Sequence, residues 1–309
     1  MRAKLVALAL ALAVLAGGCG SVHGDGPVPV LAPDRLPASR SSHVVMIVLE
    51  NKEYGDVIGN PEAPYLNGLV HRSGLATRSY AITHPSLPNY LALTSGSTHG
   101  ITSDCTDCRV AGSNLASQLD RAGRSWKAYL EGAPGRCFTG SEAGGYAKKH
   151  NPLAYYDDIV RNRVRCRRLV PLSTLTRDLR SGALPDFALI SPDLCHDTHD
   201  CGIGVGDRFL AGLVPAVRAE LGPHGFLVLT WDEGTTDAGC CGVARGGHIG
   251  TVVIGPDVRR GARSSRPVDH YGVLRFIERA LALPSLAGAR RADDRALRSL
   301  FARPPGPAE

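Results

Sequence analysis

The fold is decided by the stretch His43–Asn51, which reads HVVMIVLEN. Residues 44–49 are apolar without interruption, and most of them are β-branched. Such a run is typical of a strand that is buried on both faces, as in a parallel sheet. The run ends abruptly at Glu50 and Asn51, so two oxygen-bearing side chains directly follow the predicted strand.

Later apolar runs repeat this pattern, and helical patterns lie between them. The runs are Phe187–Ile190, Phe226–Thr230 and Thr251–Ile254, and the predicted helices cover Ser113–Leu119, Asp207–Leu221 and His270–Leu283. Pro215 implies a kink or a break within the second helix. Strands that alternate with helices predict an α/β fold with a mostly parallel central sheet and helices on both faces. In such a sheet the ligand site lies beyond the carboxyl ends of the strands.

A second stretch, Thr83–Gly96, reads THPSLPNYLALTSG and predicts a helix with a serine at its start. Pro88 suits the first turn of a helix, and Gly96 suits its end. Ser86 then lies at or just before the N-cap, beside free backbone N–H groups that favour an anion such as phosphate. From this stretch alone, Ser86 is explained equally well as a plain helix cap.

Oxygen-bearing side chains follow two of the predicted strands. Glu50 and Asn51 come after the first apolar run, and Asp232 and Glu233 come shortly after Phe226–Thr230. Each acid alone could be no more than a cap for a neighbouring helix. Hard oxygen donors gathered at one edge of a sheet suit a divalent cation, so we expect one such metal here.

Four histidines lie in polar turns of the sequence. His196 and His199 belong to the cluster CHDTHDC, Cys195–Cys201. This cluster suits either a zinc site or a small disulfide loop, and in an exported chain we favour the disulfide loop. His84 lies just before the predicted serine, and His248 lies in a Gly-rich turn. Together the four suggest a site that binds an anion or transfers protons.

A serine hydroxyl is a poor nucleophile and needs activation by a base or a metal. The carboxylate and amide side chains at the strand ends would supply such a metal site for Ser86. No G-x-S-x-G elbow surrounds this serine, which argues against an ordinary serine hydrolase. No P-loop is present in the sequence either.

The chain has 309 residues, of which 43% are hydrophobic, so a sizeable core can form. Its formal net charge is +6, and one dense basic run lies at Arg161–Arg168. Such a run is usually solvated surface, and the functional alternative is attraction of an anionic substrate or lipid surface. No aromatic residues interleave with the charge, which argues against nucleic-acid binding.

The first residues predict an export signal. Arg2 and Lys4 precede an apolar run, residues 5–15, that is too short for a comfortable membrane span. The end of this run resembles a bacterial lipoprotein box with Cys19 as the lipidated residue. We therefore expect an exported protein that is anchored by Cys19 to the outer face of the cytoplasmic membrane. Plain secretion is the alternative, and the oligomeric state is left open.

An even number of cysteines remains once Cys19 is set aside from the nine in the chain. In an exported chain this suggests disulfides. Short spacing favours Cys105–Cys108 and Cys195–Cys201, with Cys137–Cys166 next. A bond between the adjacent Cys240 and Cys241 would be strained, so we expect each of them to pair elsewhere.

Segments spread over residues 43–280 resemble, in order, the motifs of the bacterial phosphoesterase family. That family contains acid phosphatases and phospholipases C of the non-haemolytic type, and it is similar to the alkaline phosphatase superfamily. The segments are VMIVLENKEYGDVIG (45–59), HPSLPNYLALTSG (84–96), HNPLAYYDDI (150–159), SPDLCHDTHD (191–200), TWDEG (230–234), GGHIGTVVIGP (246–256) and HYGVLRFIE (270–278).

The resemblance implies an alkaline-phosphatase-like α/β fold and assigns roles to individual residues. One divalent metal would be held by Glu50, Asn51, Ser86, Asp232 and Glu233. Ser86 would be the nucleophile that forms a phosphoseryl intermediate, with His196 and His199 as the catalytic histidines. Asn89, His84 and His248 would bind the phosphoryl group, and the stretch 150–152 would line the substrate pocket without an assigned chemical role.

We therefore expect a metal-dependent phosphomonoesterase of the acid-phosphatase type that acts on a small phosphate ester. Serine stands where the phospholipases C usually carry threonine, and their large C-terminal extension is lacking. The alternatives are a phospholipase-C-type phosphodiesterase and a non-catalytic lipoprotein that binds phosphate or metal. A sulfatase is disfavoured because no arginine follows Pro88 in the C/S-x-P-x-R pattern. The expected segments are a signal (1–19), a linker (20–40), a phosphoesterase domain (41–285) with a loop-rich cap insertion (97–170), and a tail (286–309).

Overall fold

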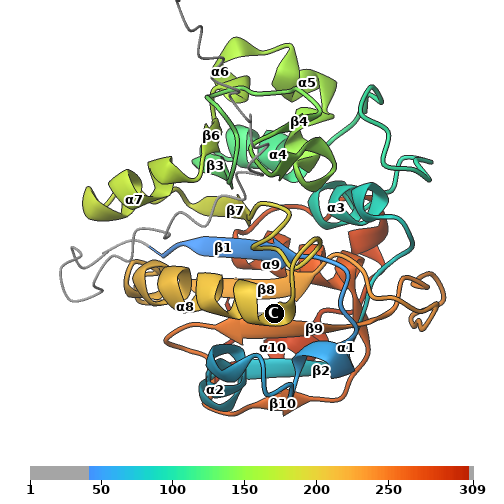
Figure 1. The fold of residues 1–309 in the computed structure, drawn as a ribbon, viewed down its shortest axis with the longest axis vertical. Coiled ribbons are helices and arrows are strands. Elements are labelled where there is room, and N and C mark those ends of the chain that lie inside the picture. Colours follow the sequence, from blue (N-terminus) through green and yellow to red (C-terminus); the bar gives the residue numbers. More distant parts are fainter. Residues whose placement is uncertain (1–41, 306–309) are drawn as a thin grey trace, which may run out of the picture.

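A nine-stranded, mostly parallel sheet forms the centre of the computed structural model, which describes residues 42–305 (Figure 1). The strand order is β10-β2-β9-β8-β1-β7-β3-β6, with β11 paired to β2. The strands are β1 (Val44–Leu49), β2 (Gly74–Tyr80), β3 (Trp126–Leu130), β6 (Leu169–Pro171), β7 (Phe187–Ser191), β8 (Phe226–Trp231), β9 (His248–Ile254), β10 (Arg263–Ser264) and β11 (Val268–Asp269). A separate hairpin joins β4 (Glu142–Ala143) and β5 (Tyr146–Ala147).

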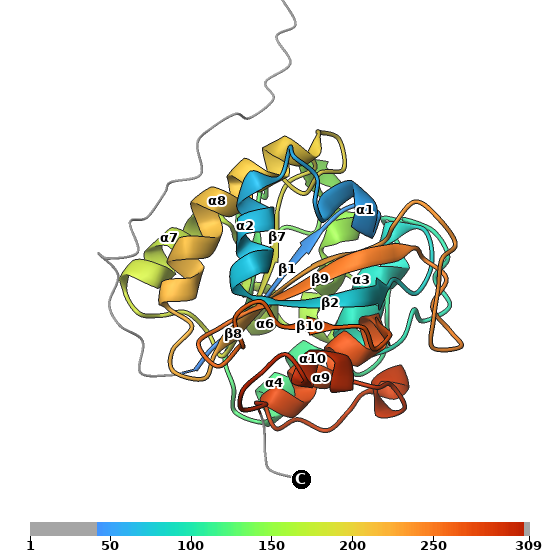
Figure 2. The same cartoon turned by 90° about the horizontal axis from the view of Figure 1, so that it is seen from below.

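Helices cover both faces of this sheet (Figure 2). They are α1 (Tyr54–Val57), α2 (Pro64–Arg72), α3 (Ser86–Ser95), α4 (Leu115–Arg121), α5 (Asp157–Val160), α6 (Arg163–Cys166), α7 (Ser173–Arg180), α8 (Ile203–Ala219), α9 (His270–Ala280) and α10 (Arg295–Arg298). Short 3-10 turns lie at η2 (Lys148–His150), η3 (Pro152–Ala154) and η4 (Ala287–Arg290). Helices α2, α7 and α8 cover one face, while α4, α9 and α10 lie on the other.

Strand β1 is buried along its whole length, as the run HVVMIVLEN predicted. Alternate side chains point to opposite faces of a strand. Val44, Met46 and Val48 therefore join the core beneath α3 and α9, and the intervening residues 45, 47 and 49 join the core beneath α2 and α8. Burial on both faces explains why the strand is apolar at every position rather than at every second one.

The pairing of β1 with its neighbouring strands determines which side chains meet at its carboxyl end. Strand β1 pairs in parallel with β7 on one side and with β8 on the other. In the β8 pairing Leu49 lies opposite Trp231, so Glu50 and Asp232 follow side by side. Strand β9 runs antiparallel to both β8 and β2, so the sheet is mixed but mostly parallel.

Three predicted helices differ from their expected bounds, and one of them, α9, ends at Ala280 rather than at Leu283. The helix expected from Ser113 begins instead at Leu115, because the side chain of Asn114 accepts the backbone N–H of Ser117 and forms a capping box. Helix α8 begins at Ile203 and continues through Pro215 without a break, because its apolar face is buried against the sheet.

Two segments that we expected to lie outside the sheet core belong to it. Residues 97–170 were expected to be loop-rich, yet they supply β3 and β6, and β3 pairs with β7. In the expected tail, Leu297, Leu300 and Phe301 are buried in the core beneath α9. The outer boundaries of the phosphoesterase domain remain a prediction, and the expected signal, linker and Cys19 lie outside the described residues.

The disulfides agree with three of the expected pairs, which are Cys105–Cys108, Cys137–Cys166 and Cys195–Cys201. The expectation for the remaining two cysteines was wrong. Cys240 and Cys241 are bonded to each other in the loop between β8 and β9. Among residues 42–305, no helix combines the length and the apolar character that a membrane span requires.

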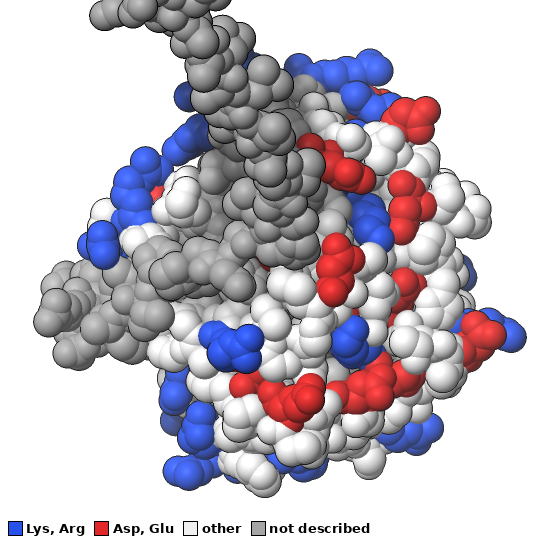
Figure 3. Space-filling view, in the orientation of Figure 1, with Lys and Arg blue, Asp and Glu red and all other residues white. Residues whose placement is uncertain are grey.

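The basic run is a surface of mixed charge. Arg165 pairs with Asp120 at 2.7 Å and with Asp158 at 2.8 Å, and Arg168 also pairs with Asp120. Figure 3 shows both signs of charge interspersed over this side of the molecule. The structure therefore favours the solvated-surface explanation of Arg161–Arg168.

Candidate active site

Ser86 is the first residue of α3, directly after the N-cap Pro85. Its side chain is buried, and its Oγ–H donates to Glu50 Oε2 at 3.0 Å. Gly96 ends the helix at φ 71°, where a Cβ would approach the Leu286 carbonyl oxygen to 2.8 Å. Only glycine fits this left-handed position closely against the neighbouring backbone, so the predicted helix and its predicted end are both observed.

Asn89 holds the turn that precedes Ser86. Its Oδ1 accepts the backbone N–H groups of Ile82 and Thr83, at 3.0 and 3.1 Å. Its Nδ2 donates to the carbonyls of Thr83 and Pro85, at 2.7 and 3.2 Å. This buried amide is therefore committed to positioning the serine, and its expected contact with phosphate stays a prediction.

Glu50 is completely buried at the end of β1. In addition to the serine hydroxyl, its carboxylate accepts the hydroxyl of Tyr90, which lies 2.5 Å from Oε1. Burial raises the pKa of Glu50 well above its ordinary value, and the charges of Asp232 and Asp197 raise it further. A carboxylate in this setting is stabilised by any cation that approaches it.

Asp232 lies beside Glu50 at the end of β8. The Asn51 backbone N–H donates to its Oδ1 at 3.2 Å, while its buried Oδ2 has no hydrogen-bond partner. Burial raises the pKa of Asp232 to about 7, with a further contribution from the charge of Glu233. His270 Nε2–H donates to the Asp232 carbonyl and fixes the backbone at this point.

His150 lies between two buried carboxylates. Its Nε2 is 3.2 Å from Glu50 Oε1, and its Nδ1 is 3.0 Å from Asp197 Oδ2. Burial lowers the pKa of His150 well below its ordinary value, so the ring is neutral and carries one N–H. Neither ring nitrogen forms a hydrogen bond, although each faces a carboxylate.

Glu50, Asp197 and Asp232 together form what we call the acidic cluster. Burial also raises the pKa of Asp197 well above its ordinary value.

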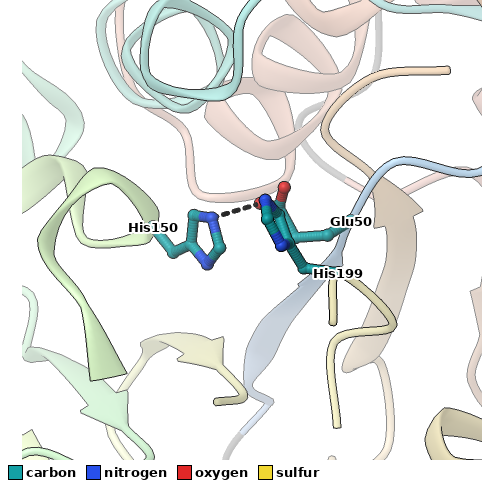
Figure 4. Close-up of side chains that lie close together, drawn as sticks. All are labelled: Glu50, His150 and His199. Atoms are coloured by element: carbon teal, nitrogen blue, oxygen red, sulfur yellow. Dashed lines mark ion pairs between the residues drawn. The ribbon is translucent and has the colours of Figure 1, made fainter. Parts of the chain in front are cut away.

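A second group of side chains shares Glu50 with the acidic cluster. Figure 4 shows that Glu50, His150 and His199 approach one another from three separate segments, and their ligand atoms lie within 4.8 Å of each other.

The unpaired atoms of this region fit a divalent cation. Asp232 Oδ2, Asp197 Oδ2 and both ring nitrogens of His150 are buried without hydrogen-bond partners. Leaving so many polar atoms unsatisfied, two of them on carboxylates, is costly unless a cation compensates them. Carboxylate oxygens with imidazole nitrogens are a donor set that divalent metals prefer.

Two further residues lie at the edge of the acidic cluster. Lys149 Nζ lies 3.2 Å from Asp104 Oδ2 and 3.0 Å from His199 Nε2. Partial burial lowers the pKa of Lys149, but the charges of Asp104 and Glu50 outweigh this effect and raise the pKa overall. Asp104 Oδ1 also accepts the backbone N–H of Leu87, the residue after the serine, at 2.9 Å.

Glu233, the residue after Asp232, pairs with His84. His84 Nδ1 lies 2.7 Å from Glu233 Oε2, and its Nε2 lies 3.1 Å from the Thr236 carbonyl. Partial burial lowers the pKa of His84, but these two acceptors outweigh it and raise the pKa overall. Both ring nitrogens of His84 thus face acceptors, which favours the protonated form of the ring.

Two of the predicted histidines belong to other groups of side chains. His196 Nδ1 lies 3.0 Å from Glu131 Oε2 and 3.4 Å from Asp193 Oδ1, and its ring stacks on Phe209. His248 Nε2 lies 2.8 Å from the Thr77 carbonyl, and its ring stacks on those of Tyr54 and Tyr80. The predicted roles of both in binding or proton transfer remain predictions.

The predicted residues Ser86, Glu50, Asn51, Asp232, Glu233 and His84 are thus linked by direct contacts, and His199 lies next to them. The sequence analysis missed Tyr90, Asp104, Lys149 and Asp197, and it gave His150 no chemical role. Signals for three of these were present, because His150 and Lys149 lie at the HNP motif and Asp197 lies within CHDTHDC. Only the folded chain shows that these segments meet.

Comparison with known proteins gives a consistent result. The sequence model of the phosphoesterase family matches residues 60–284. A phosphatidylinositol-3-phosphatase of Mycobacterium tuberculosis is 34% identical over 295 residues, which are 94% of this chain and 92% of that protein. An acid phosphatase of Aspergillus fumigatus is 30% identical over 251 residues, which are 77% of this chain but 54% of the fungal protein. The chain thus spans about half the length of the fungal relative.

Solved structures of similar fold include a murine ectonucleotide pyrophosphatase/phosphodiesterase 5, an inactive variant in complex with AMP. Its TM-score is 0.56 at 11% identity, and the match covers 85% of this chain and 100% of that one. A sulfatase from Pseudoalteromonas gives a TM-score of 0.52 at 13% identity, covering 80% of this chain and 69% of that one. At these identities the likeness shows the fold alone, and it confirms the predicted fold class.

Proposed function

Because this chain belongs to the phosphoesterase family and is a hydrolase that acts on phosphoric esters, we propose that Ser86 is the nucleophile of a metal-dependent phosphomonoesterase. The observation that carries the proposal is the hydrogen bond from Ser86 Oγ–H to Glu50 Oε2, at 3.0 Å. It joins a hydroxyl at the start of a helix to a buried carboxylate that belongs to the acidic cluster.

The metal would be held by the acidic cluster together with Ser86 and His150, and the ligand roles expected for Asn51 and Glu233 stay predictions. Two observations support this ligand set: buried oxygens of Asp197 and Asp232 form no hydrogen bonds, and neither do the two ring nitrogens of His150. When bound, a divalent cation there would favour the alkoxide form of the serine and neutralise charge on a phosphoryl oxygen.

The proposed reaction has two steps, with Ser86 as the nucleophile of the first step and water as the nucleophile of the second. Ser86 Oγ attacks phosphorus as its proton passes to Glu50 Oε2, the atom to which it already donates. The ester oxygen takes up one proton, equivalent to the proton that Glu50 received, and is released as the alcohol, while the phosphoryl group remains on Ser86. Water then attacks the phosphoserine, which releases inorganic phosphate and restores the serine hydroxyl. The role of His199 in protonating the leaving group remains a proposal.

The second candidate function is a phosphatase that acts on phosphorylated lipids. The observation that favours it is the match to the mycobacterial phosphatidylinositol-3-phosphatase, which extends over nearly the whole of both chains. Comparing initial rates on an aryl phosphate, a bis-aryl diester and a phosphoinositide monoester separates the candidates. A non-catalytic phosphate-binding lipoprotein would bind the first of these without turnover.

Replacement of the nucleophile tests the proposal. Ser86→Ala should abolish hydrolysis of an aryl phosphate while the melting temperature stays close to that of the wild type. Ser95→Ala is the matched control, because Ser95 lies at the other end of α3 and its hydroxyl donates to the Leu91 carbonyl. Turnover that survives Ser86→Ala would end the nucleophile assignment.

We also propose that the protein is exported and anchored through a lipid on Cys19. The support is the N-terminal pattern of basic residues, an apolar run and a small-residue segment before Cys19. Labelling of cells with a radioactive fatty acid tests this, with Cys19→Ser as the control variant. A wild-type protein that takes up no label would contradict the anchor.

A further inference from the structure

Lys149 is a cation at the edge of a site that is otherwise rich in carboxylates. Its side chain is 19% exposed, so it lies between the buried acidic cluster and solvent. The charges of Glu50 and Asp232 both act on its ammonium group. The residue also precedes His150 directly in η2, whose position is fixed by burial between two carboxylates. The backbone that carries Lys149 is therefore anchored to the centre of the site.

Two of the three N–H groups of the Lys149 ammonium have acceptors among the described residues. An ammonium carries three N–H donors and no acceptor. One N–H is directed at Asp104 Oδ2 and one at His199 Nε2, at 3.2 and 3.0 Å. His199 Nε2 must then be an acceptor, so its Nδ1–H donates to Asp200 Oδ1 at 2.6 Å. Among the described residues, Lys149 Nζ has no third hydrogen-bond acceptor.

Asp104 contacts both the Lys149 ammonium and the backbone next to Ser86. While Oδ2 receives Lys149, its Oδ1 accepts the backbone N–H of Leu87 at 2.9 Å. Leu87 is the residue after Ser86 in the first turn of α3. One carboxylate thus sets the position of Lys149 relative to the proposed nucleophile, and Asp104 is a positioning residue in this arrangement.

We propose that Lys149 donates its remaining N–H to a phosphoryl oxygen and so makes the site selective for phosphomonoesters over phosphodiesters. The inference rests on the proposed function of the same site. A monoester carries a charge of about −1.5 to −2 near pH 7, whereas a diester carries a single negative charge in the same range. The dianion gains more than the monoanion from a fixed cation placed beside the phosphoryl group.

The test replaces the charge and compares two substrates. Lys149→Met should lower kcat/KM for p-nitrophenyl phosphate by roughly 10- to 100-fold, the loss expected for one charge-assisted hydrogen bond. The same variant should lower kcat/KM for bis(p-nitrophenyl) phosphate by a clearly smaller factor. Lys149→Arg keeps the charge and should recover part of the monoester rate. Equal losses on both substrates would overturn the proposal.

The neighbouring lysine provides a matched control. Lys148 Nζ donates to the Thr106 carbonyl at 2.5 Å and lies over the Tyr155 ring, 4.8 Å from its centroid. Lys148→Met removes the same charge one residue away. The ratio of monoester to diester kcat/KM should therefore stay at the wild-type value. A change in this ratio as large as that of Lys149→Met would show an effect of general charge or folding and would overturn the assignment.

A binding measurement separates this proposal from the catalytic one. Calorimetric titration with inorganic phosphate is carried out on Ser86→Ala protein, with and without Lys149→Met. Loss of the lysine should weaken phosphate binding by roughly 10- to 100-fold in this background. Unchanged phosphate affinity would overturn the role of Lys149, whatever the turnover results show. Turnover that persists in Ser86→Ala would instead contradict only the nucleophile assignment.

Discussion

The chelated protein should lose stability as the pH rises from about 4 to about 7, whereas the metal-loaded protein should gain stability over the same interval. Without a cation, Asp232 is buried beside Glu50 and Glu233, and its pKa is raised to about 7 from 3.8. Between these two values the unfolded chain has lost the Asp232 proton while the folded chain retains it. The folded state therefore binds more protons, and stability falls as pH rises through this range.

The size of the effect follows from the same shift. Each pKa unit corresponds to about 1.4 kcal/mol, so ionising Asp232 at pH 7 costs the chelated protein about 4 kcal/mol. Burial raises the pKa values of Glu50 and Asp197 as well, and both add to the loss in the same direction. A bound cation compensates these charges, so the loaded protein should gain stability over the same pH interval.

Asp232→Asn isolates this contribution, because an amide keeps the acceptor for the Asn51 N–H without the charge. In chelated protein at pH 7, the variant should be more stable than the wild type by up to about 4 kcal/mol, and the difference should vanish near pH 4. Urea unfolding at several pH values measures it. As a control, Asp207→Asn should destabilise the protein, because Asp207 accepts the backbone N–H groups of Tyr65 and Leu66. A chelated variant no more stable than the wild type at pH 7 would refute the reasoning.

Other contacts of the site lead to further predictions. Tyr90→Phe removes the hydroxyl that donates to Glu50 at 2.5 Å, and kcat for an aryl phosphate should fall roughly tenfold or more in steady-state assays. Asn89→Ala leaves buried backbone groups of the preceding turn unpaired, and the free energy of unfolding in urea should fall by about 3 kcal/mol. His150→Ala should weaken metal affinity by at least about tenfold in calorimetric titrations. Rates, stabilities or affinities equal to those of the wild type would contradict the respective prediction.

The sequence predicted the central part of the sheet because its strands are buried on both faces. β1 and β8 are uninterrupted apolar runs, and such runs have few alternatives to a central parallel strand. Their parallel pairing then brings Glu50 and Asp232 together, so two of the five proposed metal ligands follow from local pattern and one rule of sheet geometry.

The remaining contacts depend on the path of long loops, which no local pattern specifies. His150 and Lys149 come from a short 3-10 turn, Asp197 from a loop after β7, and Asp104 from a loop after α3. Strand β3 was missed because its sequence, WKAYL, is short and contains a lysine. The other four residues of this strand are buried. The bond between Cys240 and Cys241 was missed because the strain of a bond between neighbouring cysteines was given too much weight.

The central claim is that the hydroxyl of Ser86 becomes covalently phosphorylated during turnover. Acid quenching of the wild-type enzyme with an aryl phosphate, followed by peptide mass spectrometry, tests this most directly. We predict one added phosphoryl group on the peptide that contains Ser86, which is absent from Ser86→Ala protein and from substrate-free controls. A phosphoryl group found reproducibly on another residue, with Ser86 unmodified during active turnover, would contradict the account.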